Sequence, residues 1–369
     1  MAGVRPRERD YAGMIATGDH VPSIPSLPTT SHAAAATEVI AAICGSWSSR
    51  AIAVAIELRI ADQLAAGPAS VEALVRDTDA DIDALYRLLR ALCSLGLCRE
   101  RIDSTFDLTD RGALLRSDGD PGRSLRNFAD WWCTHLAPVW DNLSASVGSG
   151  LSARKIALGH ERFERLELDP EAAAAFDRAM GEITQFVAAD VATLLLPDVR
   201  TIVDVGGGNG ALLVPLLEAR SSARGILYDL PSAAAAGASR IAARGLSARC
   251  ESVAGDFFKS VPAGGDEYLL KSILHDWSDA RCKAILGNVR SVLPDHGHLL
   301  VIERVMPERL EDDARCREVA RNDLNMLVGV GGRERTASAY RSLLDEAGLE
   351  LIDSRPLALY YTALIARPR

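Results

Sequence analysis

The chain has 369 residues, enough for two domains with a sizeable hydrophobic core. Charged residues make up 25% of it, and 41 basic against 50 acidic side chains give a formal net charge of −9. This balance disfavours nucleic acids, anionic membranes and polyacids as partners, because phosphate binding relies on clustered Lys and Arg, but it does not exclude small neutral or aromatic ligands.

The cysteines and the first segment indicate the cellular compartment. Seven cysteines are scattered without a CxxC pair, which favours reduced thiols over disulfides or a zinc site. The sequence has no apolar run of 18 residues and no signal-peptide pattern. Residues 1–32 are rich in Pro, Ser and Thr, and we expect a flexible N-terminal tail. These features predict a cytoplasmic protein.

Residues 33–120 show the order of a winged helix. Apolar residues recur at helical spacing from near Trp47, and a short helix follows with Ser70 as its expected N-cap. A third helix should begin at Asp81 and stop at Gly96. Two strand-like runs, CRERI and TFDLT, then predict a β-hairpin.

A winged helix raises the possibility of DNA binding. The third helix is rich in leucine, and only Arg87 and Arg90 on it favour DNA. The turn that leads into this helix carries four acids that would repel phosphate: Asp77, Asp79, Asp81 and Asp83. We therefore interpret residues 33–120 as a buried or dimer-forming module.

The middle and the last part of the chain differ in pattern. Residues 121–190 are predicted to be helical, and their aromatic and methionine side chains are either core or the lining of a substrate pocket. In residues 191–369, strand-like runs alternate with helical stretches, which predicts a doubly wound α/β domain with a parallel, Rossmann-like sheet.

A glycine loop, VDVGGGNGALL, ends the first of these strands. Gly206, Gly208 and Gly210 allow a tight turn and a close approach to a ligand. Gly206 and Gly208, followed by Ala211, also satisfy the looser GxGxxG pattern of dinucleotide-binding enzymes.

Acidic residues near the loop help to decide whether it binds a dinucleotide or another ligand. Asp204, Asp229 and Asp256 each follow one of three successive strands, and Phe257 could cover an adenine ring. Each aspartate alone could be a helix cap. Together, without a basic partner, they favour a cationic nucleoside such as S-adenosylmethionine and would repel a pyrophosphate.

A histidine, His275, ends the apolar run within the stretch LLKSILHDWSD. A lone histidine near a strand end is by itself more often a structural residue than a catalyst. Its position at the carboxyl edge of the expected sheet favours catalysis, because that edge also carries the glycine loop.

These motifs together give a family resemblance. VDVGGGNG, LYDLP, GDFF, LLKSILHDWSD, LLVIERV and GGRERT occur in the order found in S-adenosylmethionine-dependent O-methyltransferases of the plant caffeate/flavonoid type and their bacterial antibiotic-pathway relatives. The chain resembles this family over roughly residues 36–366, including the winged-helix-like dimerisation domain. The resemblance implies a class I methyltransferase fold.

The resemblance also implies a role for each matching residue. His275 would be the general base that takes a phenol proton, with Glu303 and Glu334 as the carboxylates that flank it. A phenol has a pKa of about 10 and a histidine about 6.5, so a carboxylate must stabilise the imidazolium. The implied cofactor contacts are Asp204, Gly206, Gly208, Asp229, Asp256, Phe257, Trp277 and, through its backbone, Lys271. The implied acceptor contacts are Met180, Asp323 and Met326.

The implied enzyme is a metal-free homodimer of secondary metabolism. It would methylate a hydroxyl of an aromatic or polyketide-like molecule and release S-adenosylhomocysteine. Two alternatives remain: a same-fold enzyme that uses the cofactor in hydroxylation or decarboxylation, and a winged-helix transcription regulator. The chain has one residue fewer than the plant pattern between Met326 and GGRERT, so the resemblance does not determine the shape of the acceptor pocket there.

Overall fold

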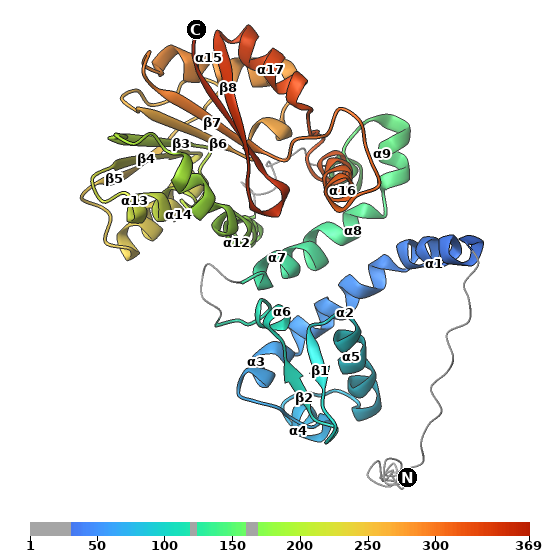
Figure 1. The fold of residues 1–369 in the computed structure, drawn as a ribbon. Coiled ribbons are helices and arrows are strands. Elements are labelled where there is room, and N and C mark those ends of the chain that lie inside the picture. Colours follow the sequence, from blue (N-terminus) through green and yellow to red (C-terminus); the bar gives the residue numbers. More distant parts are fainter. Residues whose placement is uncertain (1–30, 119–123, 160–168) are drawn as a thin grey trace, which may run out of the picture. The chain divides into compact units, whose positions relative to one another are not determined.

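The computed structural model describes residues 31–118, 124–159 and 169–369 (Figure 1). The chain separates into two compact units, the first ending at Ser46 and the second covering Trp47–Arg369. The predicted tail lies outside the described residues, except for its last two positions. These two residues, Ser31 and His32, already belong to the first helix.

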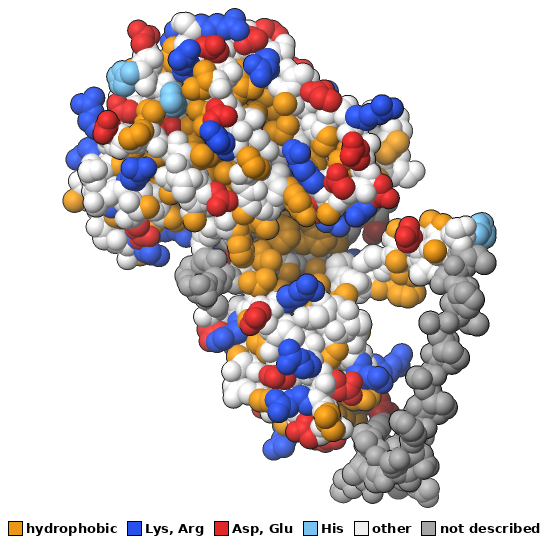
Figure 2. Space-filling model, viewed as in Figure 1, with side chains coloured by type: hydrophobic (Ala, Val, Ile, Leu, Met, Phe, Trp, Pro, Cys, Tyr) orange, Lys and Arg blue, Asp and Glu red, His pale blue; other side chains and the backbone are white. Residues whose placement is uncertain are grey.

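The described part of the first unit consists of α1 (Ser31–Ile43) and the start of α2 (Gly45–Glu57). No side chain of α1 is buried. Its large apolar residues Val39, Ile40 and Ile43 are between 58% and 73% exposed. Figure 2 shows hydrophobic side chains exposed along this helix.

The second unit begins with a small helical module. It contains most of α2, then α3 (Ile60–Ala65), α4 (Val71–Val75), α5 (Ile82–Ser94), β1 (Cys98–Glu100), β2 (Phe106–Leu108) and α6 (Asp110–Ala113). The antiparallel β1–β2 pair confirms the predicted hairpin. The predicted caps are confirmed, because the Ser70 and Asp81 side chains accept the N–H groups of Ala73 and Ala84. The single helix expected from Trp47 was wrong: Arg59 adopts a left-handed φ of 54° and separates α2 from α3.

Helices also fill the described part of residues 121–190, as predicted. They are α7 (Arg126–Trp131), the π-helical turn η2 (Trp132–Leu136), α8 (Ala137–Trp140), α9 (Leu143–Ser149), α10 (Ala153–Leu158) and α12 (Pro170–Leu194). The long helix α12 starts with Asp169 as its N-cap and a proline at its first position. Its buried Glu182 accepts the backbone N–H of Phe128, which ties it to α7.

A sheet of seven strands forms the centre of the remaining residues, in the order β5-β4-β3-β6-β7-β9-β8. The strands are β3 (Thr201–Val205), β4 (Arg224–Asp229), β5 (Cys250–Ala254), β6 (Glu267–Lys271), β7 (His298–Glu303), β8 (Leu349–Pro356) and β9 (Thr362–Pro368). The first five are parallel, as predicted. The last two are antiparallel to their neighbours, so the expectation of a wholly parallel sheet was wrong. Such an antiparallel edge is common in doubly wound folds.

Helices cover both faces of this sheet (Figure 1). Besides α12, they are α13 (Leu213–Ala219), α14 (Pro231–Ala243), α15 (Asp279–Val292) and α17 (Ala337–Glu346), whereas α16 (Ala314–Gly329) packs against α8, α9 and α10. One hydrophobic core joins the sheet to α12, α13 and α14, and a second joins it to α15 and α17. The parallel strands therefore all present their carboxyl ends at one edge, where open α/β folds bind ligands.

By length and hydropathy, no single described helix could cross a membrane, although α1 and α2 pass the same test as a pair bent by 42°.

Candidate active site

The glycine loop between β3 and α13 has the backbone that its sequence predicts. Gly206, Gly208 and Gly210 have positive φ angles of 72°, 57° and 76°, which residues with a Cβ rarely adopt. A Cβ on Gly206 would lie 2.4 Å from Cδ1 of Ile273, whereas one on Gly208 would meet nothing within 4 Å. The loop therefore leaves open space at Gly208.

Two predicted acids meet at this loop. Asp229, at the end of β4, accepts the Gly208 N–H at 2.7 Å. Asp204 is 2% exposed, and its Oδ2 has no hydrogen-bond partner among the described residues. Burial, and then the nearby Asp229, raise the pKa of Asp204 to about 7, while burial raises the pKa of Asp229. Such carboxylates fit a cationic ligand and oppose a pyrophosphate.

A third acid, Asp177 on α12, was not identified from the sequence. Its backbone carbonyl accepts Nδ2 of Asn209, a residue of the glycine loop, at 3.0 Å. Gly181, one turn later, lies against the same loop, where an added Cβ would be in contact with that amide nitrogen at 3.4 Å. Burial, and then Asp229, raise the pKa of Asp177 to about 6. Its proximity depends on the rotation of α12, which the sequence pattern did not reveal.

Aromatic rings line the site beyond β5. The ring centroid of Trp277 lies 6.1 Å from that of Phe257 and 4.7 Å from that of Phe258, both edge-on. The Arg281 guanidinium lies 4.8 Å from the Trp277 ring centroid. Asp256 accepts the N–H of Phe258 at 2.9 Å, so it also fixes the turn that presents these rings.

The backbone around His275 is held by a buried glutamate. After β6 the chain turns at Ser272, whose φ is 55°, into the 3₁₀ turn η3 (Leu274–Asp276). Glu303, the last residue of β7, is fully buried. Its Oε1 accepts three successive backbone N–H groups of the turn, at 3.1, 2.9 and 3.3 Å. The side chain of His275 is thereby fixed at the carboxyl edge of the sheet.

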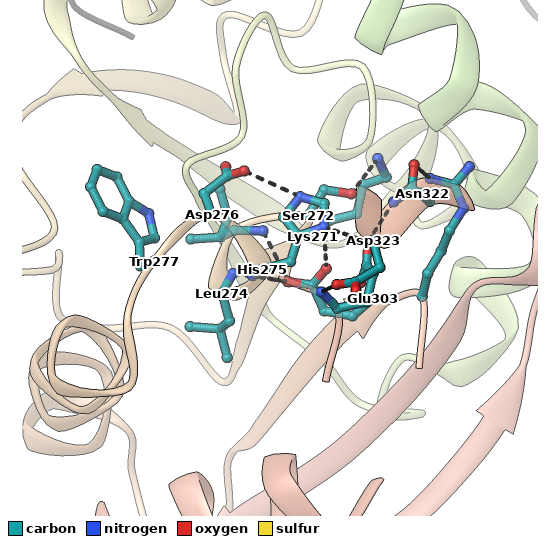
Figure 3. A network of polar contacts seen from close by, with 12 residues as sticks. Lys271, Ser272, Leu274, His275, Asp276, Trp277, Glu303, Asn322 and Asp323 are labelled. Atoms are coloured by element: carbon teal, nitrogen blue, oxygen red, sulfur yellow. Dashed lines mark hydrogen bonds and ion pairs between the residues drawn. The ribbon is translucent and has the colours of Figure 1, made fainter. Parts of the chain in front are cut away.

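Carboxylates face both nitrogens of the His275 ring (Figure 3). Nδ1 lies 3.0 Å from Oε1 of Glu334 and 3.3 Å from Oε2 of Glu303. Nε2 lies 3.5 Å from Oδ1 of Asp276. Burial alone would lower the pKa of His275, but these three carboxylates raise it well above its ordinary value. In turn, burial raises the pKa of Glu303 to about 7 although the histidine opposes it.

Two residues of α16 orient Glu334. The side-chain amide of Asn322, not identified from the sequence, donates to Oε1 of Glu334. Asp323 accepts the backbone N–H of Glu334 at 2.7 Å. Asp323, predicted to contact the acceptor, therefore also positions the partner of His275.

The segment GGRERT fixes the turn from the other side. Arg335, also missed in the sequence, is 4% exposed and donates to the carbonyls of Leu274 and Trp277 at 2.7 and 2.6 Å. A Cβ on Gly332 would lie only 2.1 Å from the carbonyl oxygen of His275. Glycine at this position lets the segment pack directly on the turn that carries His275.

The remaining predicted residues lie on three elements. Met180 on α12 and Met326 on α16 are both half-buried. Met180 packs against a cluster around Trp131. Lys271 ends β6, and its Nζ donates to Oγ of Ser272 at 3.1 Å. The ligand contacts assigned to these three residues remain predictions.

The donor atoms of His275, Glu303 and Glu334 lie within 4.8 Å of one another, a spacing that could hold a metal ion. The sequence showed no such cluster, because the three residues are distant along the chain. The arrangement also suits a proton on Nδ1, since two carboxylate oxygens, Oε1 of Glu334 and Oε2 of Glu303, face that nitrogen. The absence of a metal requirement therefore remains a prediction.

Family models match both main parts of the chain. Residues 140–350 match the O-methyltransferase domain family, and residues 40–118 match the O-methyltransferase dimerisation domain. A phenazine O-methyltransferase of Lysobacter antibioticus is 38% identical over 327 residues, which cover 88% of this chain and 94% of that protein.

Solved structures of similar enzymes share the fold. The mitomycin 7-O-methyltransferase MmcR superposes with a TM-score of 0.80 at 33% identity, covering 93% of this chain and all of that one. The O-methyltransferase NcsB1 of neocarzinostatin biosynthesis was solved with S-adenosylmethionine and 2-hydroxy-5-methyl naphthoic acid. It superposes with a TM-score of 0.70 at 31% identity, covering 87% of this chain and 96% of that one.

Proposed function

The chain belongs to the S-adenosylmethionine-dependent O-methyltransferases, and from that premise we propose that His275 is the general base that prepares the acceptor hydroxyl for methylation. The enzyme methylates a hydroxyl of an aromatic or polyketide-like molecule in natural-product biosynthesis. The observation that carries the base role is the buried contact of Nδ1 with Glu334 and Glu303.

The two ring nitrogens then have different tasks. Glu334 and Glu303 hold a proton on Nδ1 of His275, which leaves Nε2 to accept the proton of the acceptor hydroxyl. Nε2 faces Asp276 at 3.5 Å, so both sides of the resulting imidazolium are stabilised. This stabilisation brings the basicity of the histidine closer to that of a phenolate.

The cofactor site is formed by the glycine loop and its acids. Asp204, Asp229 and Asp177 would hold the positively charged and hydroxyl groups of S-adenosylmethionine, and Asp256 with Phe257 and Trp277 its adenine. The unpartnered Oδ2 of Asp204 supports this fit. The cofactor, when bound, supplies an activated methyl group. The protein's own contribution is to hold the acceptor oxygen in line with it, which can contribute roughly 7–11 kcal/mol.

The acceptor would lie between α12 and α16. Met180 and Met326 would bracket its ring, with Asp323 at its edge. Because Asp323 also bonds the Glu334 backbone, acceptor binding and base orientation share one residue.

The pH dependence of the reaction tests the base role. His275 acts only when Nε2 is unprotonated, and its pKa lies well above the usual histidine value. We therefore expect kcat/KM for a phenolic acceptor to rise with pH, with its midpoint clearly above about 6.5. Glu334→Gln should move that midpoint down, because it removes one carboxylate from Nδ1. If the midpoint of the pH profile is the same in Glu334→Gln as in the wild type, His275 is not the titrating base.

We also propose that the protein works as a homodimer through its first helices. The match to a dimerisation domain begins at residue 40. The apolar side chains of Val39, Ile40, Ile43 and Trp47 are 58% exposed or more in the single chain. Apolar surface of this kind marks an interface in soluble proteins, and sedimentation analysis would distinguish a dimer from a monomer.

A further inference from the structure

Three buried polar atoms near His275 have no hydrogen-bond partner among the described residues. They are Oε2 of Glu303, Oε2 of Glu334 and the phenol oxygen of Tyr340. Glu303 and Tyr340 are fully buried, and Glu334 is only 6% exposed. Buried polar groups in folded proteins are nearly always hydrogen-bonded, either to protein atoms or to ordered water. Three such atoms on neighbouring side chains therefore indicate a bonding partner that they share.

Tyr340 reaches this place from the first turn of α17, shortly after the GGRERT segment. Its ring belongs to the hydrophobic core that also contains Leu274 of the η3 turn and Cys282 of α15. Burial, and then the charges of Glu303 and Glu334, raise the pKa of Tyr340 well above its usual value. The phenol therefore keeps its proton throughout the pH range of the reaction, and it is a permanent hydrogen-bond donor close to the two carboxylates.

His275 cannot serve as the donor for both glutamates. Its Nδ1 carries at most one proton, and that proton is shared with Oε1 of Glu334 at 3.0 Å. Oε2 of Glu303 faces the same nitrogen at 3.3 Å without a proton of its own to accept. The Oε1 atoms are satisfied, since that of Glu303 accepts backbone N–H groups and that of Glu334 accepts the amide of Asn322. A donor on the Tyr340 side would complete both carboxylates.

The ionisation of Glu303 depends on such a donor. The charged and titratable groups that act on Glu303 or on Tyr340 are His275, Asp276, Cys282, Glu334 and Arg335. Arg335 directs its N–H groups at Leu274, Trp277 and Asp279. Burial raises the pKa of Glu303 to about 7, although His275 opposes this rise. A hydrogen bond to a carboxylate favours its ionised form, so loss of a donor would let Glu303 take up a proton near neutral pH.

We propose that the Tyr340 phenol donates, through one buried water, to Oε2 of Glu303 and Oε2 of Glu334. Both carboxylates then stay ionised beside Nδ1 of His275, so that Tyr340 sets the basicity of the histidine. One water suffices, because it can accept a hydrogen bond from the phenol and donate one to each carboxylate. Tyr340 is thus a positioning residue that acts through the glutamates. The inference rests on the proposed function, because it takes His275 to be the general base.

Tyr340→Phe removes only the phenol oxygen, and the readout is the pH profile of kcat/KM for a phenolic acceptor. The midpoint should fall by about 0.5–1 pH unit, the equivalent of one hydrogen bond of ordinary strength. It falls because Glu303 takes up a proton and one charge beside Nδ1 of His275 is lost. The melting temperature should fall by about 1–3 °C. Unchanged affinity for S-adenosylhomocysteine would show that the variant is folded.

Tyr268→Phe is the matched control. Tyr268 is fully buried in the same core as Tyr340. Its hydroxyl, however, bonds the carbonyl of Pro262 at 2.8 Å and the N–H of Gly265 at 3.2 Å. This variant should lower the melting temperature by a similar amount and leave the midpoint of the pH profile unchanged. A purely structural role of Tyr340 predicts the same behaviour for both variants, so equal midpoints in the two would overturn the inference.

The double variant Tyr340→Phe/Glu334→Gln tests whether the tyrosine acts through the carboxylates. Loss of the Glu334 charge by itself favours the ionised form of Glu303. The double variant should therefore shift the midpoint by less than the sum of the two single shifts, and additive shifts would contradict the inference.

The single variants separate this inference from the proposed function. If Glu334→Gln moves the midpoint and Tyr340→Phe does not, Tyr340 has no part in the basicity of His275, and the proposed function stands. A higher melting temperature in Tyr340→Phe would likewise show that the phenol is unpaired in the wild type, and the inference fails. If neither variant moves the midpoint, His275 is not the titrating base, and the proposed function fails together with the inference.

Discussion

Replacement of His275 by alanine should lower kcat by about 10²- to 10⁴-fold, the usual contribution of a general base, while the affinity for S-adenosylhomocysteine stays unchanged. Nε2 is the ring nitrogen turned away from Glu303 and Glu334, and the carboxylate that faces it, Asp276 at 3.5 Å, is a weaker type of base than an imidazole. Glycine-loop and acid contacts do not involve the ring, so cofactor binding should persist.

The measurement needs a control for folding and one for chemistry. His296→Ala removes an exposed histidine and should not change kcat. Rates should be normalised to sites counted by S-adenosylhomocysteine titration, because loss of the imidazole leaves Glu303 and Glu334 buried without it. The kcat of the His275→Ala variant should fall far less with an acceptor whose phenol is ionised at neutral pH than with an acceptor whose phenol has a pKa near 10. Equal losses for both acceptors would assign His275 to positioning and not to proton transfer.

Gly208→Ala should weaken S-adenosylhomocysteine binding by about 10- to 100-fold, comparable to overpacking by about 1–3 kcal/mol. A Cβ at Gly208 meets no protein atom within 4 Å, so it would project into the space that the ligand needs. The positive φ of 57° also disfavours alanine, and some loss of stability accompanies the change.

Gly245→Ala is the matched control for that loss. Gly245 has a φ of 67° and also nothing within 4 Å of an added Cβ, but it follows α14 and lies outside the glycine loop. Both variants should lower the melting temperature by a similar amount, and only Gly208→Ala should lose affinity. If the two variants bind equally well, the open space at Gly208 is not the cofactor site.

Local features of the structure were predictable because neighbours along the chain determine them. The caps Ser70 and Asp81 precede apolar helical patterns, and the glycine spacing matches the positive φ angles of the loop. The parallel strands β3 to β7 follow from their alternation with helices. The antiparallel β8 and β9 could not be predicted from alternation, since no crossover helix separates them.

The missed residues act across long sequence distances. Arg335 reaches the carbonyl of Leu274, and Asn322 links Arg304 to Glu334, through contacts that depend on how α16 and the GGRERT segment pack. Asp177 faces the glycine loop only because α12 is rotated that way. The apolar periodicity predicts one continuous helix through Arg59. The left-handed backbone of Arg59 breaks that helix, and a backbone angle of this kind cannot be recognised from the spacing of apolar residues.

The helix α1 has 13 residues, and none of them is buried within its own chain. A helix of this length is marginal in water, because its nucleation is unfavourable and each added residue contributes little. In the proposed homodimer the partner's surface would cover and stabilise this helix, so that folding of the segment and association of two chains would form one equilibrium. By mass action, dilution would then favour the melted helix, and we expect both the circular dichroism signal and the melting temperature to depend on protein concentration.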